Sequence, residues 1–340
     1  FFPRPPRFLT RANIESLEPV VNTRNAKGGF EYSDCYLYDN DARFVFNFIR
    51  TSMNYGCVAA NYVASTAAKR EGDLWHVTAQ DTISGKSFPI RARALVNACG
   101  PYVDQHNSLS QQSTEHHHVF SKGIHLIVDQ VTPNKRVLTF FASDGRLFFV
   151  IPMGRRTCIG TTDTQVDEPQ TQVTEQDRQF VLDNINALLS LPTPITHNDI
   201  IAERCGVRPL AVTGKGGKAD WVKLSRKHAI DVNHGQKHLS IFGGKLTDCL
   251  NVGEEVVEII RALGISIPYP KHRWYGEPND DIKKEYLHQA RLIDLDSLTN
   301  EISSEPLSVR FWRRYGAEAI GLLERIRANP ANAKLLIENA

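Results

Sequence analysis

Three basic side chains occur in sequence contexts that suit the binding of an oxyanion. Arg208 ends an apparent strand just before a proline, and Arg226 lies in a lysine-rich loop. Arginine presents a planar fork of donors that matches two oxygens of a phosphate or a carboxylate. Lys245 follows the pair Gly243–Gly244 and adds a compact positive charge. The alternatives are an ion pair between domains for Arg208 and a solvated surface position for Lys245.

The two glycines before Lys245 stand between an apolar strand, residues 239–242, and a helix that we expect to begin at Thr247 or Asp248 and to reach about residue 263. Glycine lets the backbone approach a flat ring closely. The first turn of a helix offers unpaired N–H groups and a positive potential. We therefore expect this turn to accept a planar, anionic group, with an ordinary turn before a helix as the alternative.

Histidines supply the candidate proton-transfer group and a candidate metal site. His125 alternates with Ile124 and Leu126, so its side chain could face a ligand, although a lone histidine on a strand is more often structural. The run His116–His118 invites a metal site. Consecutive strand residues point to opposite faces, so three in a row converge poorly on one ion. We expect an exposed polar turn there and no metal.

The composition is that of an ordinary globular protein. The chain has 340 residues, 41% of them hydrophobic and 23% charged, with a formal net charge of +2, which is enough for two or three domains. A charge so close to zero gives no reason to expect nucleic acid as a partner. The six scattered cysteines form no C-x-x-C pair, so we expect free thiols in a reducing compartment and a small buried residue at Cys99. The longest apolar stretch, residues 147–153, is too short to span a bilayer.

The first third of the chain has the pattern of half of a nucleotide-binding α/β domain. A helix over residues 41–55 precedes strands over 57–65, 74–81 and 87–96, and the last of these runs into Asn97–Pro101. No G-x-G-x-x-G follows a strand at the start, where it would place a pyrophosphate on a helix N-terminus. Because the first residue is Phe1 and no signal sequence is visible, we expect a processed, truncated or excerpted chain.

The rest of the chain predicts a β-rich region followed by helices. Residues 119–164 are rich in strands, residues 174–189 form a helix with Thr174 as its N-cap and Asp177 completing a capping box, and a strand covers 200–210. Beyond a boundary near 264–275, the segments 280–292, 307–326 and 330–340 read as helices with polar faces.

Four segments, in order and at matching spacing over about residues 20–265, resemble the FAD-dependent sn-glycerol-3-phosphate dehydrogenases. The first is Gly28–Cys35 with Asp41–Arg43 after it, and the second is Leu95–Pro101. The third joins Val150–Pro152 to Ile159–Thr164, and the fourth joins Gly206–Leu210 to Leu239–Thr247. Family members continue Gly-Gly-Lys as Leu-Thr-Thr-Tyr-Arg, whereas this chain has Leu246–Leu250 as Leu-Thr-Asp-Cys-Leu, which indicates a divergent subfamily.

The resemblance implies an α/β fold with an incomplete FAD-binding Rossmann-like domain, an antiparallel-sheet substrate domain and a C-terminal helical domain. The boundaries it suggests are 1–115 for the remainder of the FAD-binding domain, 116–238 for the substrate domain, 239–264 for a returning strand and helix, and 270–340 for part of the helical domain. The Gly-rich phosphate loop of the family would precede Phe1, so we expect the chain to lack it.

The resemblance also assigns site residues. Arg208, Arg226 and Lys245 would bind substrate, and Arg208, Lys245 and His125 would take part in catalysis. FAD would contact the following residues: Val58, Ala59, Ala98, Gly100, Gly243, Gly244, Lys245, Leu246 and Thr247. Asp163 is expected either to form a turn or to orient a group near the site.

The function implied is oxidation of sn-glycerol 3-phosphate to dihydroxyacetone phosphate in glycerol and glycerophospholipid metabolism, with electrons passing to quinone. The resemblance implies a cytoplasmic protein, peripheral to the inner face of the cytoplasmic membrane, and leaves a homodimer and an oxygen acceptor open. One alternative is an amine or amino-acid oxidase of the same architecture, whose carboxylate substrate usually needs one arginine. Another is a truncated, catalytically inactive fragment that binds flavin weakly.

Overall fold

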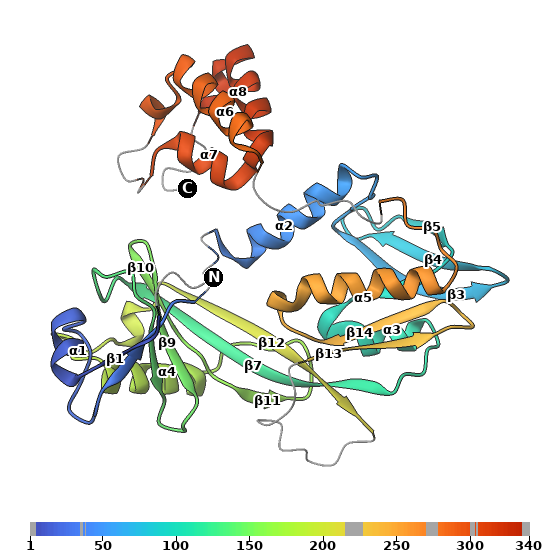
Figure 1. Ribbon diagram of the computed structural model, residues 1–340. Helices are drawn as coiled ribbons and strands as arrows, with labels where there is room; N and C mark the ends of the chain where they lie inside the picture. Colours follow the sequence, from blue (N-terminus) through green and yellow to red (C-terminus); the bar gives the residue numbers. More distant parts are fainter. Residues whose placement is uncertain are drawn as a thin grey trace. The chain divides into compact units, whose positions relative to one another are not determined.

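The computed structural model describes residues 5–34, 37, 39–214, 227–269, 278–299, 303 and 305–334 (Figure 1). The chain divides into two compact units. The first consists of Phe1–Tyr36 and Ala60–Ile267, and the second of Leu37–Ala59 and Pro268–Ala340. The strands are β1 Arg7–Leu9, β2 Gly29–Glu31, β3 Val63–Glu71, β4 Leu74–Asp81, β5 Ser87–Ala92, β6 Leu95–Asn97, β7 His116–Asp129, β8 Leu138–Phe141, β9 Leu147–Met153, β10 Arg156–Gly160, β11 Thr164–Val166, β12 Ala202–Thr213, β13 His228–Asn233 and β14 His238–Gly243. The helices are α1 Arg11–Leu17, α2 Asn40–Met53, α3 Val103–Leu109, α4 Glu175–Leu188, α5 Cys249–Ala262, α6 Asp280–Leu292, α7 Leu307–Tyr315 and α8 Ala319–Ala328. The predicted α/β class, with antiparallel sheets and C-terminal helices, is confirmed; the predicted domain boundaries stay predictions.

The first unit is organised by the long strand β7. Antiparallel pairing joins β7 to β12 along the whole of β12, with Arg208 opposite Ser121, and the other edge of β7 pairs with β10 and then with β11. Strands β9 and β8 extend the sheet beyond β10. Alternate residues of β7 face opposite sides, so the strand contributes to two surfaces of different chemistry.

One face of this sheet is packed against α4. The buried core contains alternating residues of β7, namely Ile124, Leu126 and Val128, together with side chains from β9, β10 and α4. Its remaining buried members are Leu138, Ala142, Phe148, Val150, Ile159, Val181, Leu182, Ile185, Leu189 and Ile195. The predicted capping box of α4 is confirmed, because Thr174 and the N3 residue Asp177 each bond to the other's backbone N–H.

A buried ion pair fixes β7 to the start of α4. The Nζ of Lys122 lies 2.5 Å from Oδ2 of Asp177, and the two side chains are 6% and 7% exposed. Burial by itself would raise the pKa of Asp177, but hydrogen bonds from Lys122 and Thr174 lower it below its usual range. Asp177 therefore stays ionised, and it serves the helix cap and the strand at once.

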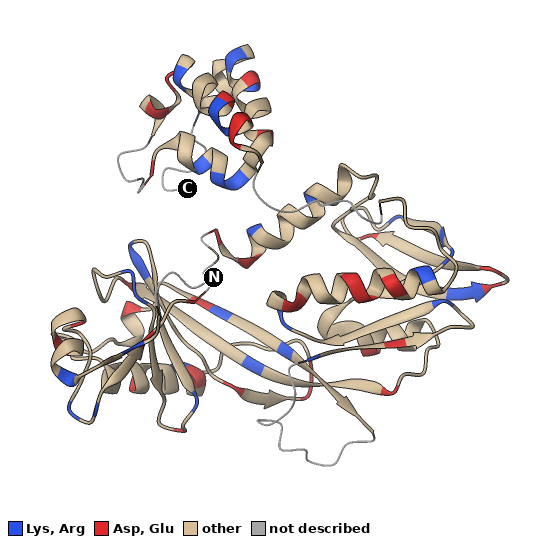
Figure 2. Cartoon of the chain, viewed as in Figure 1, with Lys and Arg blue, Asp and Glu red and all other residues tan. Residues whose placement is uncertain are grey.

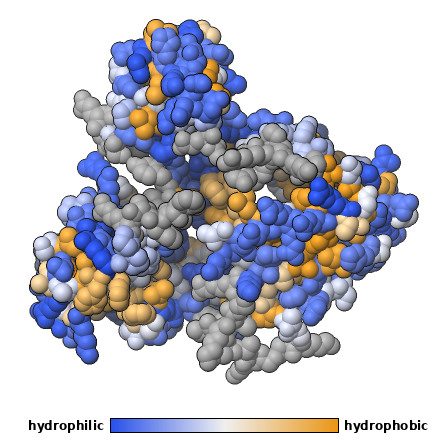
Figure 3. All heavy atoms as spheres, viewed as in Figure 1, coloured by the Kyte–Doolittle hydropathy of each residue, from blue (hydrophilic) through white to orange (hydrophobic). Residues whose placement is uncertain are grey.

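The first unit also contains two three-stranded sheets, one of which includes β6. Strand β14 pairs with β13 in antiparallel fashion and with β6 in parallel fashion, and β3, β4 and β5 form a meander. Trp75 of β4 is fully buried, and its indole N–H donates to the backbone oxygen of Gln236 at 2.8 Å. Phe88 and Ile90 of β5 remain more than 40% exposed, and Figure 3 shows hydrophobic atoms at the surface around β4 and β5.

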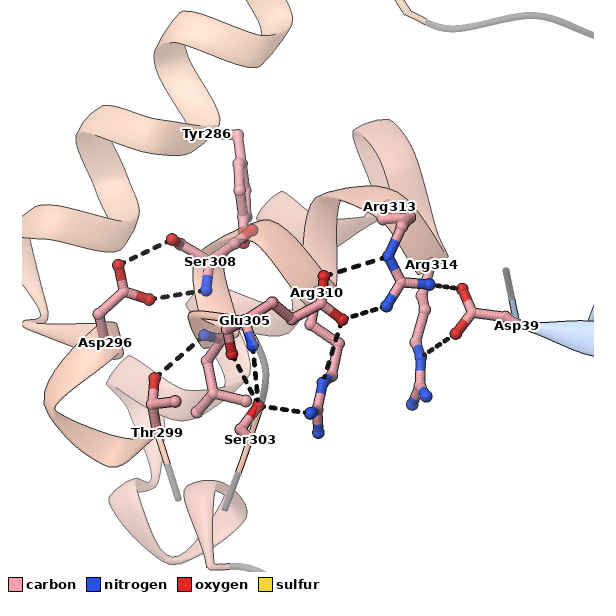
Figure 4. A network of polar contacts seen from close by, with 11 residues as sticks. Asp39, Tyr286, Asp296, Thr299, Ser303, Glu305, Ser308, Arg310, Arg313 and Arg314 are labelled. Atoms are coloured by element: carbon pink, nitrogen blue, oxygen red, sulfur yellow. Dashed lines mark hydrogen bonds and ion pairs between the residues drawn. The ribbon is translucent and has the colours of Figure 1, made fainter. Parts of the chain in front are cut away.

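The second unit packs α6, α7 and α8 around a core that includes Tyr286 and Trp312. Figure 4 shows the polar network that holds α7 in place. The carboxylate of Asp39, just before α2, accepts from Arg313 and, at 3.1 Å, from Arg314, and Glu305 also accepts from Arg313. No helix in the described ranges of the chain is long and apolar enough to cross a membrane.

Several local predictions were wrong. The run His116–His118 is the start of β7, not an exposed turn, since His118 is buried and the ring of His116 binds Asp231. The strand predicted over 57–65 begins only at Val63. The helix predicted over 307–326 is interrupted at Gly316, whose φ of 53° is left-handed, so two helices form instead. Of the helix predicted over 330–340, residues 330–333 form a 3₁₀ turn and 335–340 lie outside the described residues.

We predict that Lys122→Met destabilises the fold by about 3–5 kcal/mol, because it leaves the buried carboxylate of Asp177 without its cation. Urea denaturation measures the loss. The matched control is Lys69→Met, which removes a lysine from an ion pair with Glu71 whose side chains are 72% and 54% exposed, and which should cost less than about 1 kcal/mol. Equal losses in the two variants would contradict this account.

Candidate functional site

The face of β7 and β12 opposite to α4 carries the candidate site. Directly paired residues of antiparallel strands share a face, and the pairs here are Arg208 with Ser121, Gly206 with Gly123, and Arg204 with His125. The residues of β7 between these positions, Lys122 and Ile124, point towards α4. Figure 2 shows the basic residues of β7 and β12 as separate blue segments.

The guanidinium of Arg208 is held by oxygen atoms at the end of β10. Its Nη2 lies 3.1 Å from Oγ1 of Thr161, and its Nη1 lies 3.5 Å from the backbone oxygen of Thr162 and 3.8 Å from Oδ1 of Asp163. Asp163 also accepts from the hydroxyl of Ser121. Asp163 therefore contacts both Arg208 and Ser121, and its role near a site stays a prediction. The side chain of Arg208 is 37% exposed, so it remains accessible to a dissolved anion.

Glycine at position 123 is what gives the Arg208 side chain its room. A Cβ added to Gly123 would lie 2.5 Å from Nη1 and 2.7 Å from Cζ of Arg208. Such distances are far inside van der Waals contact, so the guanidinium rests directly on the backbone of β7. A second close approach occurs at Gly160, where a Cβ would lie 2.6 Å from the backbone oxygen of Ile124 and 2.9 Å from Cδ2 of His125.

His125 is a neutral imidazole in this environment. Burial, and to a smaller extent the positive charges of Arg208 and Arg204, lower its pKa to about 4. The ring is therefore unprotonated near neutral pH and has a lone pair on one nitrogen. A neutral imidazole between two arginines can accept a proton once an anion has neutralised those cations.

The Gly243–Lys245 turn contacts β12 at Ala211. Gly243 and Gly244 have φ of 62° and 90°, conformations that favour glycine. A Cβ on Gly243 would lie 3.2 Å from Cβ of Ala211, which is on β12 three residues after Arg208. Gly244, Lys245, Leu246 and Thr247 are exposed, and they lead into α5 as predicted.

A hydrogen bond from the backbone of Gly243 to the side chain of His118 on β7 holds this turn. The N–H of Gly243 donates to Nε2 of His118 at 3.0 Å, which requires that nitrogen to be unprotonated. Burial lowers the pKa of His118, and the nearby carboxylate of Asp104 partly opposes this shift. The third histidine of the triplet thus supports the glycine turn, a role that its sequence position did not reveal.

Residues 97–100 end the strand that runs parallel to β14, so the carboxyl ends of β6 and β14 meet at one edge. The side-chain amide of buried Asn97 donates to Asn107 at 2.8 Å, and Ser240 of β14 donates to the same oxygen at 2.8 Å. Gly100 has a φ of 55°, with nothing within 4 Å of where a Cβ would be. Ala98 is exposed, and so is Cys99, contrary to the prediction that Cys99 is a buried residue.

The structure brings Arg208 and His125 onto one face and sets the glycine turn beside β12. Arg226 lies outside the described residues. Val58 and Ala59 belong to the other compact unit, where they are exposed and outside any strand. Sequence reasoning missed Arg204, Ser121 and Thr161; the spacing Arg204-x-Gly206-x-Arg208 on one strand is the signal that could have revealed the first of them.

No cluster of histidine, cysteine, aspartate and glutamate suited to a metal ion occurs in the part of the chain that the structure describes. The five cysteines whose positions are described are free thiols. The polar groups gathered around Arg208 are oxygen atoms of Thr161, Thr162 and Asp163.

We predict that stability falls as the pH is lowered from about 6.5 towards 4, because unfolded histidine has a pKa of about 6.5. The folded pKa is about 4 for His125 and for His238, and that of His118 is also lowered. The unfolded chain then binds more protons than the folded chain in this window, which favours unfolding. Urea midpoints between pH 7.5 and 4.5 measure the slope, and His125→Asn should reduce it; an unchanged slope in the variant would contradict the assignment.

Comparison with known proteins identifies the fold. The family described as FAD dependent oxidoreductase matches residues 2–236. The chain is 34% identical over 248 residues to the aerobic glycerol-3-phosphate dehydrogenase of Bacillus subtilis, covering 72% of this chain and 43% of that protein. The glycerol-3-phosphate dehydrogenase of Bacillus halodurans, solved with FAD, superimposes with a TM-score of 0.73 at 24% identity, covering 97% of this chain and 66% of that one.

A glycine oxidase from Geobacillus kaustophilus has a TM-score of 0.52 at 17% identity, covering 82% of this chain and 68% of that one, so the fold is shared beyond one activity. The chain spans less than half the length of the Bacillus subtilis relative. The match over residues 2–236 covers well over half of the chain, which therefore belongs to the family of FAD-dependent oxidoreductases.

Proposed function

We propose that the protein of which this chain is part oxidises sn-glycerol 3-phosphate to dihydroxyacetone phosphate with FAD as cofactor and passes the electrons to quinone. The substrate is proposed from one observation: Arg204 and Arg208 lie on the same face of the β7–β12 pair as the neutral His125. A phosphate dianion needs more than one cation, and forked donors suit it. Peripheral attachment to the inner face of the cytoplasmic membrane and a homodimer are further parts of the proposal.

The described residues fit FAD at the edge where β6 and β14 end. In open α/β sheets, ligands bind beyond the carboxyl ends of parallel strands, and both Gly100 and the Gly243–Gly244 turn lie there in left-handed conformations. The main chain of residues 98–100 and 243–247 would hold the cofactor, with Lys245 and the start of α5 beside its negative charge. FAD supplies the acceptor for two electrons.

In this proposal the chain binds and orients the substrate as follows. Arg208, oriented by Thr161 and Asp163, would bind the phosphate together with Arg226, and Lys245 would contact the other end of the substrate. The phosphate would neutralise the two arginines of β12, which removes part of the cause that lowers the pKa of His125. His125 would then be better able to accept the hydroxyl proton.

An amino-acid or amine oxidase is the second candidate, because such enzymes share the architecture. A carboxylate carries a single charge and is usually bound by one arginine, whereas two arginines share the face of β12 here. The third candidate is an inactive fragment. In the described part of the chain, β6 is an edge strand of its sheet.

We predict that the complete protein binds FAD and that glycerol 3-phosphate bleaches the flavin absorbance under anaerobic conditions. The chain of 340 residues alone should bind FAD weakly, because the pyrophosphate would lack its helix N-terminus. The measurement is the visible absorbance spectrum of each protein with FAD, recorded before and after addition of glycerol 3-phosphate, glycine or sarcosine. Bleaching by an amine and not by glycerol 3-phosphate would favour the second candidate.

We predict that Arg208→Ala in the complete protein lowers kcat/KM for glycerol 3-phosphate about a hundredfold, a loss of roughly 3 kcal/mol. Gly123→Ala should have a similar effect, because its Cβ would displace the guanidinium of Arg208. The control is Arg156→Ala on β10, where the side chain is 48% exposed and pairs with Asp129. Unchanged kinetics in Arg208→Ala would remove this residue from the site.

A further inference from the structure

His228 stands between two carboxylates at the start of α5. Its Nδ1 lies 2.6 Å from Oδ2 of Asp248, and its Nε2 lies 2.8 Å from Oε2 of Glu255. A carboxylate only accepts hydrogen bonds, so both ring nitrogens must donate, and only the protonated imidazole has two N–H groups. The geometry therefore selects a positively charged histidine.

The same residue contacts the glycine turn. His228 opens β13 directly opposite Gly243 of β14, and a Cβ on Gly244 would lie 3.3 Å from Cβ of His228. The imidazole is 16% exposed, which limits competition from water at this junction. One side chain thus lies against the turn and reaches both Asp248, which precedes α5, and Glu255 in its second turn.

Helix α5 is held by ionic contacts as well as by apolar packing. Its apolar side chains Val252, Val256, Val257, Ile259 and Ile260 are half-buried, and none of its side chains is fully buried. Asp248 makes no side-chain cap to the helix; its carboxylate binds His228 and the amide of Asn251 instead. Figure 2 shows the acidic residues along α5, of which Glu255 is the one that reaches β13. The two hydrogen bonds of His228 therefore join α5 to β13.

We propose that His228 is a positioning residue, which as an imidazolium bound to Asp248 and Glu255 fixes the start of α5 and with it the Gly243–Lys245 turn that receives the cofactor. The expected effect on cofactor binding rests on the proposed flavin function, whereas the role of His228 in fixing α5 rests on the geometry of its hydrogen bonds.

The pH dependence has a definite sign. Hydrogen bonds to Glu255 and to Asp248 raise the pKa of His228, whereas its burial opposes them. Opposite it on β14 stands Gly243, which has no side chain, so these two carboxylates are the charged groups that face the ring from β14, the turn and α5. A raised pKa means that the attachment is complete below pH 6.5 and is lost as the pH rises through the folded value.

The first test measures the turn without flavin, by hydrogen exchange of the amides of residues 244–256 in the full chain. His228→Gln should increase their exchange rates about tenfold at pH 6.5 and leave those of β7 unchanged, because local opening no longer breaks two charge-assisted bonds. Glu255→Gln is the milder variant if His228→Gln fails to fold. Its matched control is Glu254→Gln, the same exposed change one residue away on α5.

The second test measures FAD affinity of the complete protein between pH 6 and 9. Wild-type affinity should fall about tenfold as His228 loses its proton, and His228→Gln should be weak at every pH. His228→Arg keeps a cation with several donors, so it should restore affinity and remove the pH dependence. The hydrogen-exchange result stands if no FAD binds at all, in which case only the proposed function fails. Unchanged exchange in His228→Gln and Glu255→Gln, or a pH profile shared by wild type and His228→Gln, overturns the proposal.

Discussion

The register between β7 and β12 is the constraint on which the rest of the first unit depends. Strand pairing alternates side chains with a period of two, so a slip of one residue would turn every side chain to the opposite face. If β12 slipped, Arg208 would face α4, away from His125. If β7 slipped instead, His125 would face α4 and Lys122 would leave Asp177. The buried lysine thus does more than stabilise: because a charged amine has one partner on one side of the sheet, it specifies which side that is.

The glycine turn is held by two histidines that need opposite protonation states. His118 accepts from the N–H of Gly243 and must be neutral, whereas His228 donates to two carboxylates and must be charged. At His118 the effect of burial outweighs that of the Asp104 carboxylate, whereas at His228 two carboxylates at hydrogen-bond distance outweigh the effect of burial. The turn therefore depends on the local balance between burial and charge at each of the two histidines.

Much of the local structure could be predicted because its causes are local. The cap of α4 depends on Thr174 and Asp177, three residues apart, and strand β4 shows alternation over its whole length. The position of the Arg208 guanidinium could not be predicted, because it depends on an absent side chain at Gly123, on another strand. The triplet His116–His118 misled for the same reason: its partners, Asp231 and the N–H of Gly243, are more than a hundred residues away. Val58 and Ala59 were placed by resemblance alone, and Arg226 is outside the described residues.

The contact between Arg208 and the backbone at Gly123 has a consequence for how this protein can evolve. A side chain at position 123 and a long side chain at position 208 exclude each other from the same space. Substitutions at the two positions are therefore epistatic, and the order in which they arise matters. A larger residue at 123 becomes tolerable only after residue 208 has been shortened, and by then the arginine is gone. The combination of Gly123 and Arg208 is thus easy to lose and difficult to regain, because its recovery requires both residues to change back.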